Sequence, residues 1–414
     1  MIAAGEPGPP DAPVRDATRR SFLKALVAGS AGVTYLGGAH VLLKDDRWSE
    51  NRSYWVARGL APVTPPLRGQ AEADLIVIGA GVTGLSAAIH ARLAAPERRV
   101  LLIEARHAGF GATGRSGGVI GAGTEMGEPE GTADNTGFVL GLIDRFGIDC
   151  DLDHDGETAH LDPYRYAVGL KQAAESIGVR VHENSRVTAI RDGATIEVAG
   201  DGFAARAPLA IVAANGYMPK LGIAAARIFP VHTGAAVTVP LPRALLDRLP
   251  SDIHEMTSRE MYMWGRKVGG ERLLVGSGAE YSYDNGLACG GERFMFAALR
   301  RFFDKTYPEL RPYPFAHAWT GPMGCTTDQE PIVGRLGDRG GILYGGAYSG
   351  HGLAMGTRTG AFLAGWVDGR EPPRWMLRPT LDLPGEPLRY VGVNMMINLM
   401  NLGWFSMPKY GAEA

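Results

Sequence analysis

The stretch from Asp74 to Glu104, DLIVIGAGVTGLSAAIHARLAAPERRVLLIE, decides the fold of this chain. Leu75–Ile78 and Val100–Ile103 are short apolar runs typical of buried parallel strands. Between them, residues 85–93 have helical spacing and no breaker. A strand, a glycine turn, a helix and a second strand in this order predict a dinucleotide-binding βαβ unit.

Each residue type in this unit has a physical reason. Gly79 permits the tight turn, Gly81 lets the backbone approach a pyrophosphate, and Gly84 lets the helix pack close to the strand. The pyrophosphate is then expected at the positive end of the helix. Glu104 lies 20 residues after Gly84 and can accept a hydrogen bond from a ribose 2′-hydroxyl. The alternative, a glycine turn without a ligand, does not account for the complete unit.

The whole chain sets the limits of the interpretation. Its 414 residues are enough for two domains, and a net charge of −2 without a long basic run gives no reason to expect nucleic-acid binding. The three cysteines, Cys150, Cys289 and Cys325, lack metal-ligand spacing, so we expect buried thiols and no metal site.

The N-terminal residues are expected to lie outside the fold. Residues 1–48 combine a disordered start with Thr18-Arg-Arg-Ser-Phe-Leu-Lys24 and a moderately apolar segment, and this core resembles the twin-arginine export signal. The alternative is a basic cap on an ordinary helix. The resemblance implies export of the folded protein by the twin-arginine translocation machinery to the periplasm or another extracytoplasmic space, with the signal either cleaved or kept as an anchor. Residues 49–73 are predicted to form a Pro-rich linker.

A second glycine-rich loop follows Glu104 directly. Residues 105–118, ARHAGFGATGRSGG, can wrap another face of a ligand with backbone N–H groups. With this loop, the chain resembles the D-amino-acid-oxidase-like superfamily of FAD enzymes, which includes glycine oxidase and sarcosine oxidase. The resemblance implies that Glu104 holds the adenosine ribose and that the Gly114–Gly118 turn passes beneath the flavin.

Later segments extend the resemblance. We predict a helix over 164–177, strands over 179–182, 186–190, 195–198 and 209–213, and a closing motif, TDQEPIVG at 327–334 with LYGGAYSGHG at 343–352. The helix over 353–367 would direct its positive end at the pyrimidine side of the flavin. The family's cofactor-binding positions correspond here to Gly79, Ala80, Gly81, Thr83, Gly84, Glu104, Ala105, Arg106, Thr113, Gly114, Arg115, Ser116, Gly117, Gly118, Val187, Ala214, Asn215, Gly346, Ser349, Gly350, His351, Gly352 and Leu353.

The branch that the chain most resembles is the γ-glutamylputrescine oxidoreductase-like group, and three departures bear on substrate and cofactor. Between Leu152 and Asp162 the chain has a few residues where relatives have several tens, which belong to the cap over the substrate. Ala354 stands where sarcosine-oxidase-like members carry a carboxylate-anchoring Lys, which favours an amine over an α-amino acid. Gly321 stands at the position of covalent flavin linkage, so we expect non-covalent FAD although Cys325 is nearby.

Three side chains are candidates for catalysis. His351 is the first choice near the reacting face, with a structural histidine capping the last helix as its alternative. Arg115 could stabilise anionic reduced flavin or bind an acidic group of the substrate. Its alternative is a surface salt bridge. Tyr262, which shares a strand face with Trp264, could line the substrate cavity. Its alternative is packing in the core of the β-sheet.

The predicted fold is α/β: a discontinuous Rossmann-like FAD-binding domain over 74–227 and 321–372, with a smaller antiparallel β-sheet substrate domain over 228–320. A tail over 373–414 with an apolar helix at 388–405 is expected to pack on the flavin domain, with a membrane or quinone-side contact as the alternative. The predicted function is FAD-dependent oxidation of an amine to an imine, with oxygen or a respiratory carrier as electron acceptor. The alternatives are a catalytically silent flavin-binding relative, an amino-acid oxidase or dehydrogenase, and an NAD-dependent dehydrogenase, which the second glycine loop disfavours.

Overall fold

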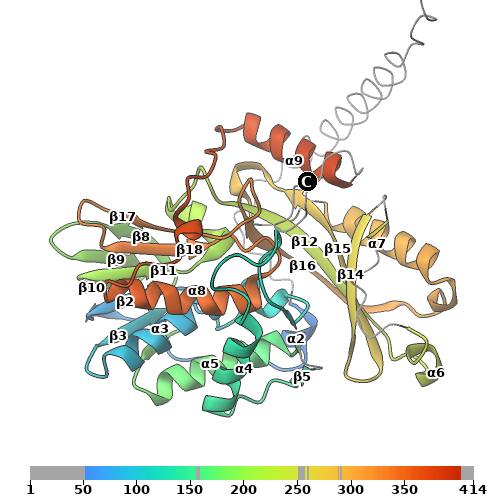
Figure 1. Cartoon of the computed structure of the whole chain (residues 1–414), viewed down its shortest axis with the longest axis horizontal. Helices are drawn as coiled ribbons and strands as arrows, with labels where there is room; N and C mark the ends of the chain where they lie inside the picture. The colour runs from blue at the N-terminus through green and yellow to red at the C-terminus, as the bar shows by residue number, and fades with distance from the viewer. Residues whose placement is uncertain are drawn as a thin grey trace, which may run out of the picture. The chain divides into compact units, whose positions relative to one another are not determined.

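A computed structural model describes residues 52–154, 159–249, 257–258, 261–287, 289 and 291–401, and Figure 1 shows their helices and strands. All of them belong to one compact unit, Asp45–Ala414. The predicted export signal in residues 1–48 lies outside the described residues. Among the residues described, no helix is long and apolar enough to span a membrane.

The centre of the fold is a six-stranded sheet in the order β17-β18-β11-β2-β3-β7. Five strands run parallel and the edge strand β17 runs antiparallel to β18. The predicted Rossmann-like α/β architecture is therefore confirmed. The bounds are β2 (Leu75–Ile78), β3 (Val100–Ile103), β7 (Arg180–His182), β11 (Leu209–Val212), β17 (Ile332–Leu336) and β18 (Ile342–Gly346).

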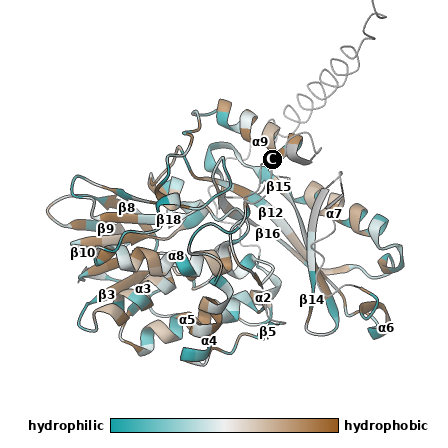
Figure 2. Cartoon of the chain, in the orientation of Figure 1, coloured by the Kyte–Doolittle hydropathy of each residue, from teal (hydrophilic) through white to brown (hydrophobic). Residues whose placement is uncertain are grey.

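Two different layers cover the faces of this sheet, because successive side chains of a strand point to opposite sides. Leu75 and Val77 of β2 pack into the core of the helical layer, whereas Ile76 and Ile78 pack into the core beneath a four-stranded sheet. This double burial explains why β2 and β3 are apolar throughout (Figure 2). The helical layer contains α3 (Val82–Ala94), α4 (Asn135–Phe146), α5 (Pro163–Ser176) and α8 (Gly352–Val367).

The four-stranded sheet has the order β1-β10-β9-β8. The predicted hairpin around Asp192-Gly193 is present, since β8 and β9 pair antiparallel on either side of it. The bounds are β1 (Gly69–Glu72), β8 (Val187–Arg191), β9 (Ile196–Gly200) and β10 (Phe203–Ala207).

A separate five-stranded antiparallel sheet has the order β13-β14-β15-β12-β16. The amphipathic α7 (Glu292–Thr306) covers it, placing Leu299, Phe302 and Phe303 against Leu273 and Val275. Its last strand continues past residue 320, the limit expected from the sequence, to Cys325. The bounds are β12 (Phe229–Thr238), β13 (Thr257–Ser258), β14 (Met261–Val268), β15 (Arg272–Tyr281) and β16 (Phe315–Cys325), with the short α6 (Arg243–Leu246) after β12.

The segment interpreted as a linker is, over residues 52–72, an integral part of the fold. It forms α2 (Tyr54–Ala57) and strand β1, which pairs in parallel with β10. Trp55 is 2% exposed and packs in one cluster with Tyr164 and Trp319. The prolines in this segment led to its interpretation as a linker, but its buried Trp55 packs between α5 and the antiparallel sheet.

The C-terminal helix α9 (Leu388–Asn401) packs mainly on the antiparallel sheet, and the expectation that it packs on the flavin domain is wrong in this respect. Asn394 accepts a hydrogen bond from the Tyr281 backbone N–H and donates one to its carbonyl, at 3.1 and 3.0 Å. Arg389 of this helix also donates a hydrogen bond to the carbonyl of Ala225, which lies in the segment predicted as the flavin domain. Figure 1 shows α9 beside β15.

Candidate active site

One cavity of about 820 Å³ extends from the carboxyl ends of the parallel strands to the antiparallel sheet. Ile78 and Ile103, the last residues of β2 and β3, line one part of it, and Gly234, Trp264 and Ser277 of the antiparallel sheet line another. The carboxyl edge of a doubly wound sheet is where such folds bind ligands. The cavity is therefore the candidate active site.

The first glycine turn forms the cavity wall at the start of α3. Gly79 has φ +104°, and a Cβ on it would lie 2.8 Å from the Ala213 carbonyl oxygen, so only glycine fits there without strain. Gly81, Val82 and Thr83 line the cavity at the helix N-terminus, and Thr113 accepts a hydrogen bond from the Val82 N–H at 3.2 Å. Since the first N–H groups of a helix lack intrahelical partners, this end favours an anionic ligand group.

Glu104 faces the cavity from the end of β3. Its Oε2 accepts a hydrogen bond from the Ala80 N–H at 2.7 Å, and its Oε1 accepts one from the Arg106 N–H at 2.9 Å. Burial raises the pKa of this carboxyl, and the backbone donors oppose that shift. Each carboxylate oxygen retains further acceptor capacity, which suits ribose hydroxyl groups.

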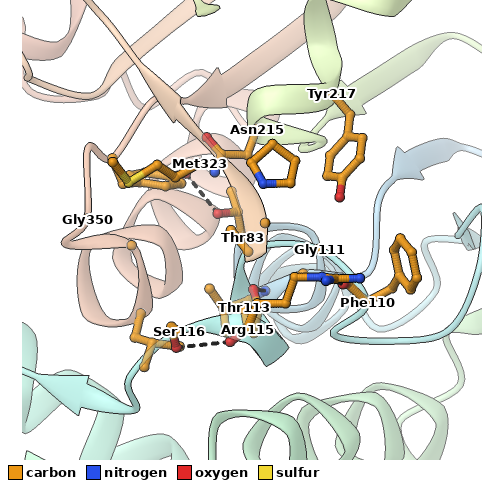
Figure 3. Close-up of a pocket in the computed structure, with 18 of the residues that line it drawn as sticks. Thr83, Phe110, Gly111, Thr113, Arg115, Ser116, Asn215, Tyr217, Met323 and Gly350 are labelled. Atoms are coloured by element: carbon orange, nitrogen blue, oxygen red, sulfur yellow. Dashed lines mark hydrogen bonds between the residues drawn. The ribbon is translucent and has the colours of Figure 1, made fainter. Parts of the chain in front are cut away.

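Arg115 lies on the second glycine loop and connects it to the antiparallel sheet. Its Nε donates to the Phe110 carbonyl at 3.0 Å and its Nη1 donates to the Thr320 carbonyl at 2.8 Å. The guanidinium lies 5.0 Å from the Phe110 ring centroid (Figure 3), and burial lowers its pKa from the ordinary value. The structure places this half-buried side chain on the cavity wall, where it donates to backbone carbonyls.

Two side chains far away in sequence hold the same loop, and sequence reasoning missed both roles. Trp55 donates from Nε1 to the Ser116 carbonyl at 2.9 Å. Arg266 donates from Nε to the Gly117 carbonyl at 2.6 Å and lies 5.2 Å from the Trp55 ring centroid. The alternation of Trp264 and Arg266 on one strand was the available signal, but it did not indicate which loop they would contact.

The closing motif forms another part of the cavity wall. Ser349 and Gly350 have left-handed backbones, with φ 49° and 113°. Gly352, Leu353 and Ala354 then line the cavity with the first turn of α8. Asn215 supports this motif by accepting the Ala347 N–H at 2.8 Å. A second helix N-terminus thus borders the same cavity and favours electron-rich ligand groups there.

His351 lines the cavity just before α8, and its ring does not cap that helix. Its Nδ1 lies 3.0 Å from Oε2 of Glu125, a cavity residue that the sequence did not single out. His351 is the N-cap residue of α8, as the alternative reading expects, although its side chain makes no capping hydrogen bond.

The cavity contains most of the positions predicted to bind the cofactor. Those that line it are Gly79, Gly81, Thr83, Glu104, Ala105, Thr113, Arg115, Ser116, Gly117, Gly118, Val187, Ala214, Asn215, Ser349, Gly350, His351, Gly352 and Leu353. The structure does not place Ala80, Gly84, Arg106, Gly114 or Gly346 in the lining. Of these five, Ala80 and Arg106 support the lining through their backbone hydrogen bonds to Glu104.

Tyr262 is a predicted site residue whose side chain lies outside the described part of the chain; its backbone, in β14, pairs with Thr257 of β13. Trp264, two residues further on, lines the cavity. Its ring lies against Gly117, where an added Cβ would meet it at 2.5 Å. The antiparallel sheet and the second glycine loop therefore meet at an aromatic contact beside the cavity.

The two positions considered for covalent flavin attachment offer no reactive thiol at the cavity. Gly321 lines the cavity, where an added Cβ would meet Arg115 Cδ at 2.6 Å. Cys325 is 6% exposed and outside the lining, and burial raises the pKa of its thiol to about 12. A buried, neutral thiol is a poor nucleophile.

The shortened region between Leu152 and Asp162 contains a minimal hairpin. Strands β5 (Asp153–His154) and β6 (Ala159–His160) have two residues each, and β6 also pairs with β4 (Val119–Ile120). No further segment of the described residues from this region joins the antiparallel sheet.

The residues present fit a dinucleotide cofactor. The turn at Gly79 leaves no room for a side chain, an acidic strand end faces the cavity at Glu104, and two helix N-termini border one continuous space. A Rossmann-type sheet of this kind, facing an antiparallel sheet across one cavity, is typical of dinucleotide-dependent oxidoreductases.

Comparison with known families makes the assignment specific. The chain belongs to the DAO family of FAD dependent oxidoreductases, whose model matches residues 74–158 and 154–366. The two matched segments meet within the minimal hairpin, where the sequence predicted the loss of a cap segment. Membership in this family implies FAD as the cofactor.

Relatives and solved structures agree with the family. The chain is 26% identical to "Probable oxidoreductase OrdL" of Rhizobium meliloti (strain 1021), over 79% of this chain and 90% of the relative. It is 27% identical to Gamma-glutamylputrescine oxidoreductase of Escherichia coli (strain K12), over 70% and 82%. The crystal structure of glycine oxidase from Geobacillus kaustophilus has the same fold, with a TM-score of 0.60 at 18% identity, covering 73% of this chain and 96% of that one.

Proposed function

We propose that this FAD-dependent oxidoreductase oxidises the C–N bond of an amine to an imine, which water then hydrolyses. The observation that carries the proposal is Ala354, a methyl side chain that lines the cavity at the position where the family resemblance puts a carboxylate-binding Lys. In this chain, the carboxylate of an α-amino acid substrate would find no lysine at this position. The similarity to Gamma-glutamylputrescine oxidoreductase supports an amine substrate.

The cations of the cavity give this proposal further support. In the described lining they are Arg115, Arg186 and Lys220. Arg115 donates to the carbonyls of Phe110 and Thr320, and Lys220 donates to the Asp284 carbonyl at 2.9 Å. These hydrogen bonds within the protein reduce the capacity of Arg115 and Lys220 to anchor a substrate carboxylate.

The chain's own residues would bind and orient the reactants. FAD, when bound, accepts the two electrons and the hydrogen removed from the amine α-carbon. Gly79–Thr83 and Glu104 would hold its pyrophosphate and ribose, and the first turn of α8 would stabilise negative charge that develops on reduction. Trp264 and the closing motif would confine the amine. No side-chain base is required, because a neutral amine uses its own lone pair when the flavin removes the α-hydrogen with its two electrons.

A substrate screen tests the proposal. The FAD-loaded protein is mixed anaerobically with primary, secondary and polyamines, and the visible flavin band is followed. Bleaching by at least one amine, faster than by sarcosine or D-amino acids, is the expected result. If only amino acids bleach the flavin, the substrate is an amino acid and the proposed amine substrate is wrong. Admitting oxygen or a quinone analogue afterwards identifies the class of electron acceptor.

The minimal β5–β6 hairpin favours a second candidate, a catalytically silent flavoprotein. With a shortened cap, the substrate side of the cavity could bind a ligand or partner without turnover. This candidate predicts bound FAD that no amine or amino acid in the screen reduces, while dithionite reduces it fully.

We also propose that FAD is bound non-covalently and that the loaded protein is exported. The buried Cys325 thiol and the position of Gly321 against Arg115 support non-covalent binding. Acid precipitation should release the flavin into the supernatant, and flavin retained in the protein pellet would contradict the proposal. The twin-arginine sequence supports export by that machinery to the periplasm or another extracytoplasmic space.

A further inference from the structure

Glu125 places a carboxylate on the cavity wall beside the closing motif. Its Oε2 lies 3.0 Å from Nδ1 of His351, and its side chain is 31% exposed. Within the described residues its Oε1 has no recorded hydrogen-bond partner. Glu104 is the other acidic side chain of the described lining, and its oxygens already accept the Ala80 and Arg106 N–H groups. Since the remaining acceptor sites of Glu104 are expected to hold the cofactor ribose, Glu125 is the acidic group of this lining that is left for a substrate.

The loop that carries Glu125 is anchored on the buried side. Thr124 donates from its hydroxyl to Oε1 of Glu330 at 2.8 Å, and Glu330 is 3% exposed. The Thr124 backbone N–H also donates to the Gly127 carbonyl at 2.6 Å, and the Met126 N–H donates to the Thr124 hydroxyl at 3.2 Å. These bonds fix the turn on both sides of Glu125, so its carboxylate has a defined position.

A carboxylate with one free oxygen on a cavity wall recognises a cationic nitrogen. The nitrogen that loses its α-hydrogen must be neutral, because oxidation to an imine uses its lone pair. A cation at Glu125 is then a second nitrogen of the same molecule, which stays protonated at neutral pH. Apolar groups of the same cavity, among them Trp264 and Leu353, can contact the methylene chain between the two nitrogens.

We propose that Glu125, oriented by His351 and Thr124, binds the second ammonium group of a diamine or polyamine substrate. This inference rests on the proposed amine oxidation and names its substrate class. His351 keeps its contact with Oε2 while the ammonium contacts Oε1, so the ring acts as a positioning residue in this subsite.

The test compares putrescine with n-pentylamine, in which a methyl group replaces the second ammonium. Binding is measured by calorimetry on protein reduced beforehand with dithionite, since reduced flavin cannot oxidise the ligand. Wild-type protein should bind putrescine more tightly than n-pentylamine. Glu125→Gln should weaken putrescine binding roughly 10- to 100-fold, the worth of a hydrogen bond to a charged group, and change pentylamine binding less than about twofold.

Glu130→Gln is the matched control, because Glu130 is on the same loop but exposed and outside the cavity lining. It should leave the binding of both ligands unchanged. If Glu125→Gln weakens both ligands equally, or neither, the subsite does not exist even if amines bleach the flavin. If putrescine binding depends on Glu125 but no amine bleaches the oxidised protein, the subsite stands and the proposed oxidation falls.

Discussion

Glu104 uses both carboxylate oxygens within the protein and still faces the cavity. The bonds to the Ala80 and Arg106 N–H groups order the two glycine loops on either side of β3. A ribose bound to the same carboxylate would therefore depend on the geometry of both loops. This arrangement explains why an acidic residue at the end of the second strand helps to predict dinucleotide binding from the sequence.

We expect Glu104→Gln to weaken FAD binding about 10- to 100-fold, because the amide NH₂ must face one of the two backbone donors and the charged acceptor is lost. Titration of apoprotein with FAD, followed by quenching of flavin fluorescence, measures the Kd. Glu97→Gln, at an exposed position outside the cavity, is the control and should leave the Kd unchanged. An unaltered Kd for Glu104→Gln would remove the carboxylate from the cofactor site.

At the scale of elements, the contact between α3 and α8 positions both helix N-termini that border the cavity. Ser86 of α3 donates to the Thr357 carbonyl of α8 at 2.6 Å, and the Thr83 hydroxyl lies 2.8 Å from the Tyr348 hydroxyl. Gly360 brings the backbones together, since a Cβ there would collide with the Thr83 carbonyl and lie 2.7 Å from the Ala87 nitrogen. Cofactor geometry therefore depends on one close helix crossing.

We expect Gly360→Ala to destabilise the protein by about 1–3 kcal/mol through overpacking, despite the higher helix propensity of alanine. It should also weaken FAD binding, because α8 must move away from α3. Thermal unfolding followed by circular dichroism and by flavin release measures both effects.

Gly141→Ala in α4 is the control for propensity, because a Cβ there meets nothing within 4 Å. It should stabilise the protein by up to about 1 kcal/mol without changing FAD affinity. Equal stabilisation by both substitutions would show that the helix crossing tolerates a methyl group.

The elements that sequence predicted are those whose information is local. The βαβ unit, the 187–200 hairpin and α8 each follow from residues within one short stretch, and the structure contains all of them. The roles of Trp55, Arg266 and Glu125 were missed, because each depends on a partner more than 60 residues away. The packing of 52–72 and of α9 was missed for the same reason, since prolines or an apolar face do not identify the surface that they meet.

At the scale of the whole molecule, a buried ion pair ties the N-terminal lead-in to the nucleotide-binding sheet. Glu183 follows β7, is 2% exposed, and lies 3.0 Å from the ammonium of Lys171 on α5. Its carboxylate also accepts the N–H groups of Thr64 and Ala108, each at 2.6 Å. Burial alone would raise the pKa of Glu183, but these donors and Lys171 together hold it below the ordinary value of 4.5.

We expect Glu183→Gln to destabilise the protein by about 3–5 kcal/mol at neutral pH, because the Lys171 charge is left buried without its main partner. A carboxyl whose pKa is lowered on folding contributes its full stability above the unfolded pKa and loses it as the pH falls through the folded pKa. The difference between wild type and variant should therefore shrink below about pH 4.5, as urea unfolding midpoints at several pH values will show. A double variant with Lys171→Met should recover part of the loss, and a pH-independent difference would rule out the charge as its cause.

The last prediction concerns where the loaded protein acts, and it depends on Arg19 and Arg20. The twin-arginine route moves folded proteins, so a chain whose cavity is lined by residues from Ile78 to Ala354 could fold around FAD before export. Lysine at both positions should hold the flavin-loaded protein in the cytoplasm, as cell fractionation with immunoblotting and flavin assay will show. Arg15→Lys, just before the motif, is the control and should leave export intact. Unchanged export of the double variant would show that these arginines are not the export signal.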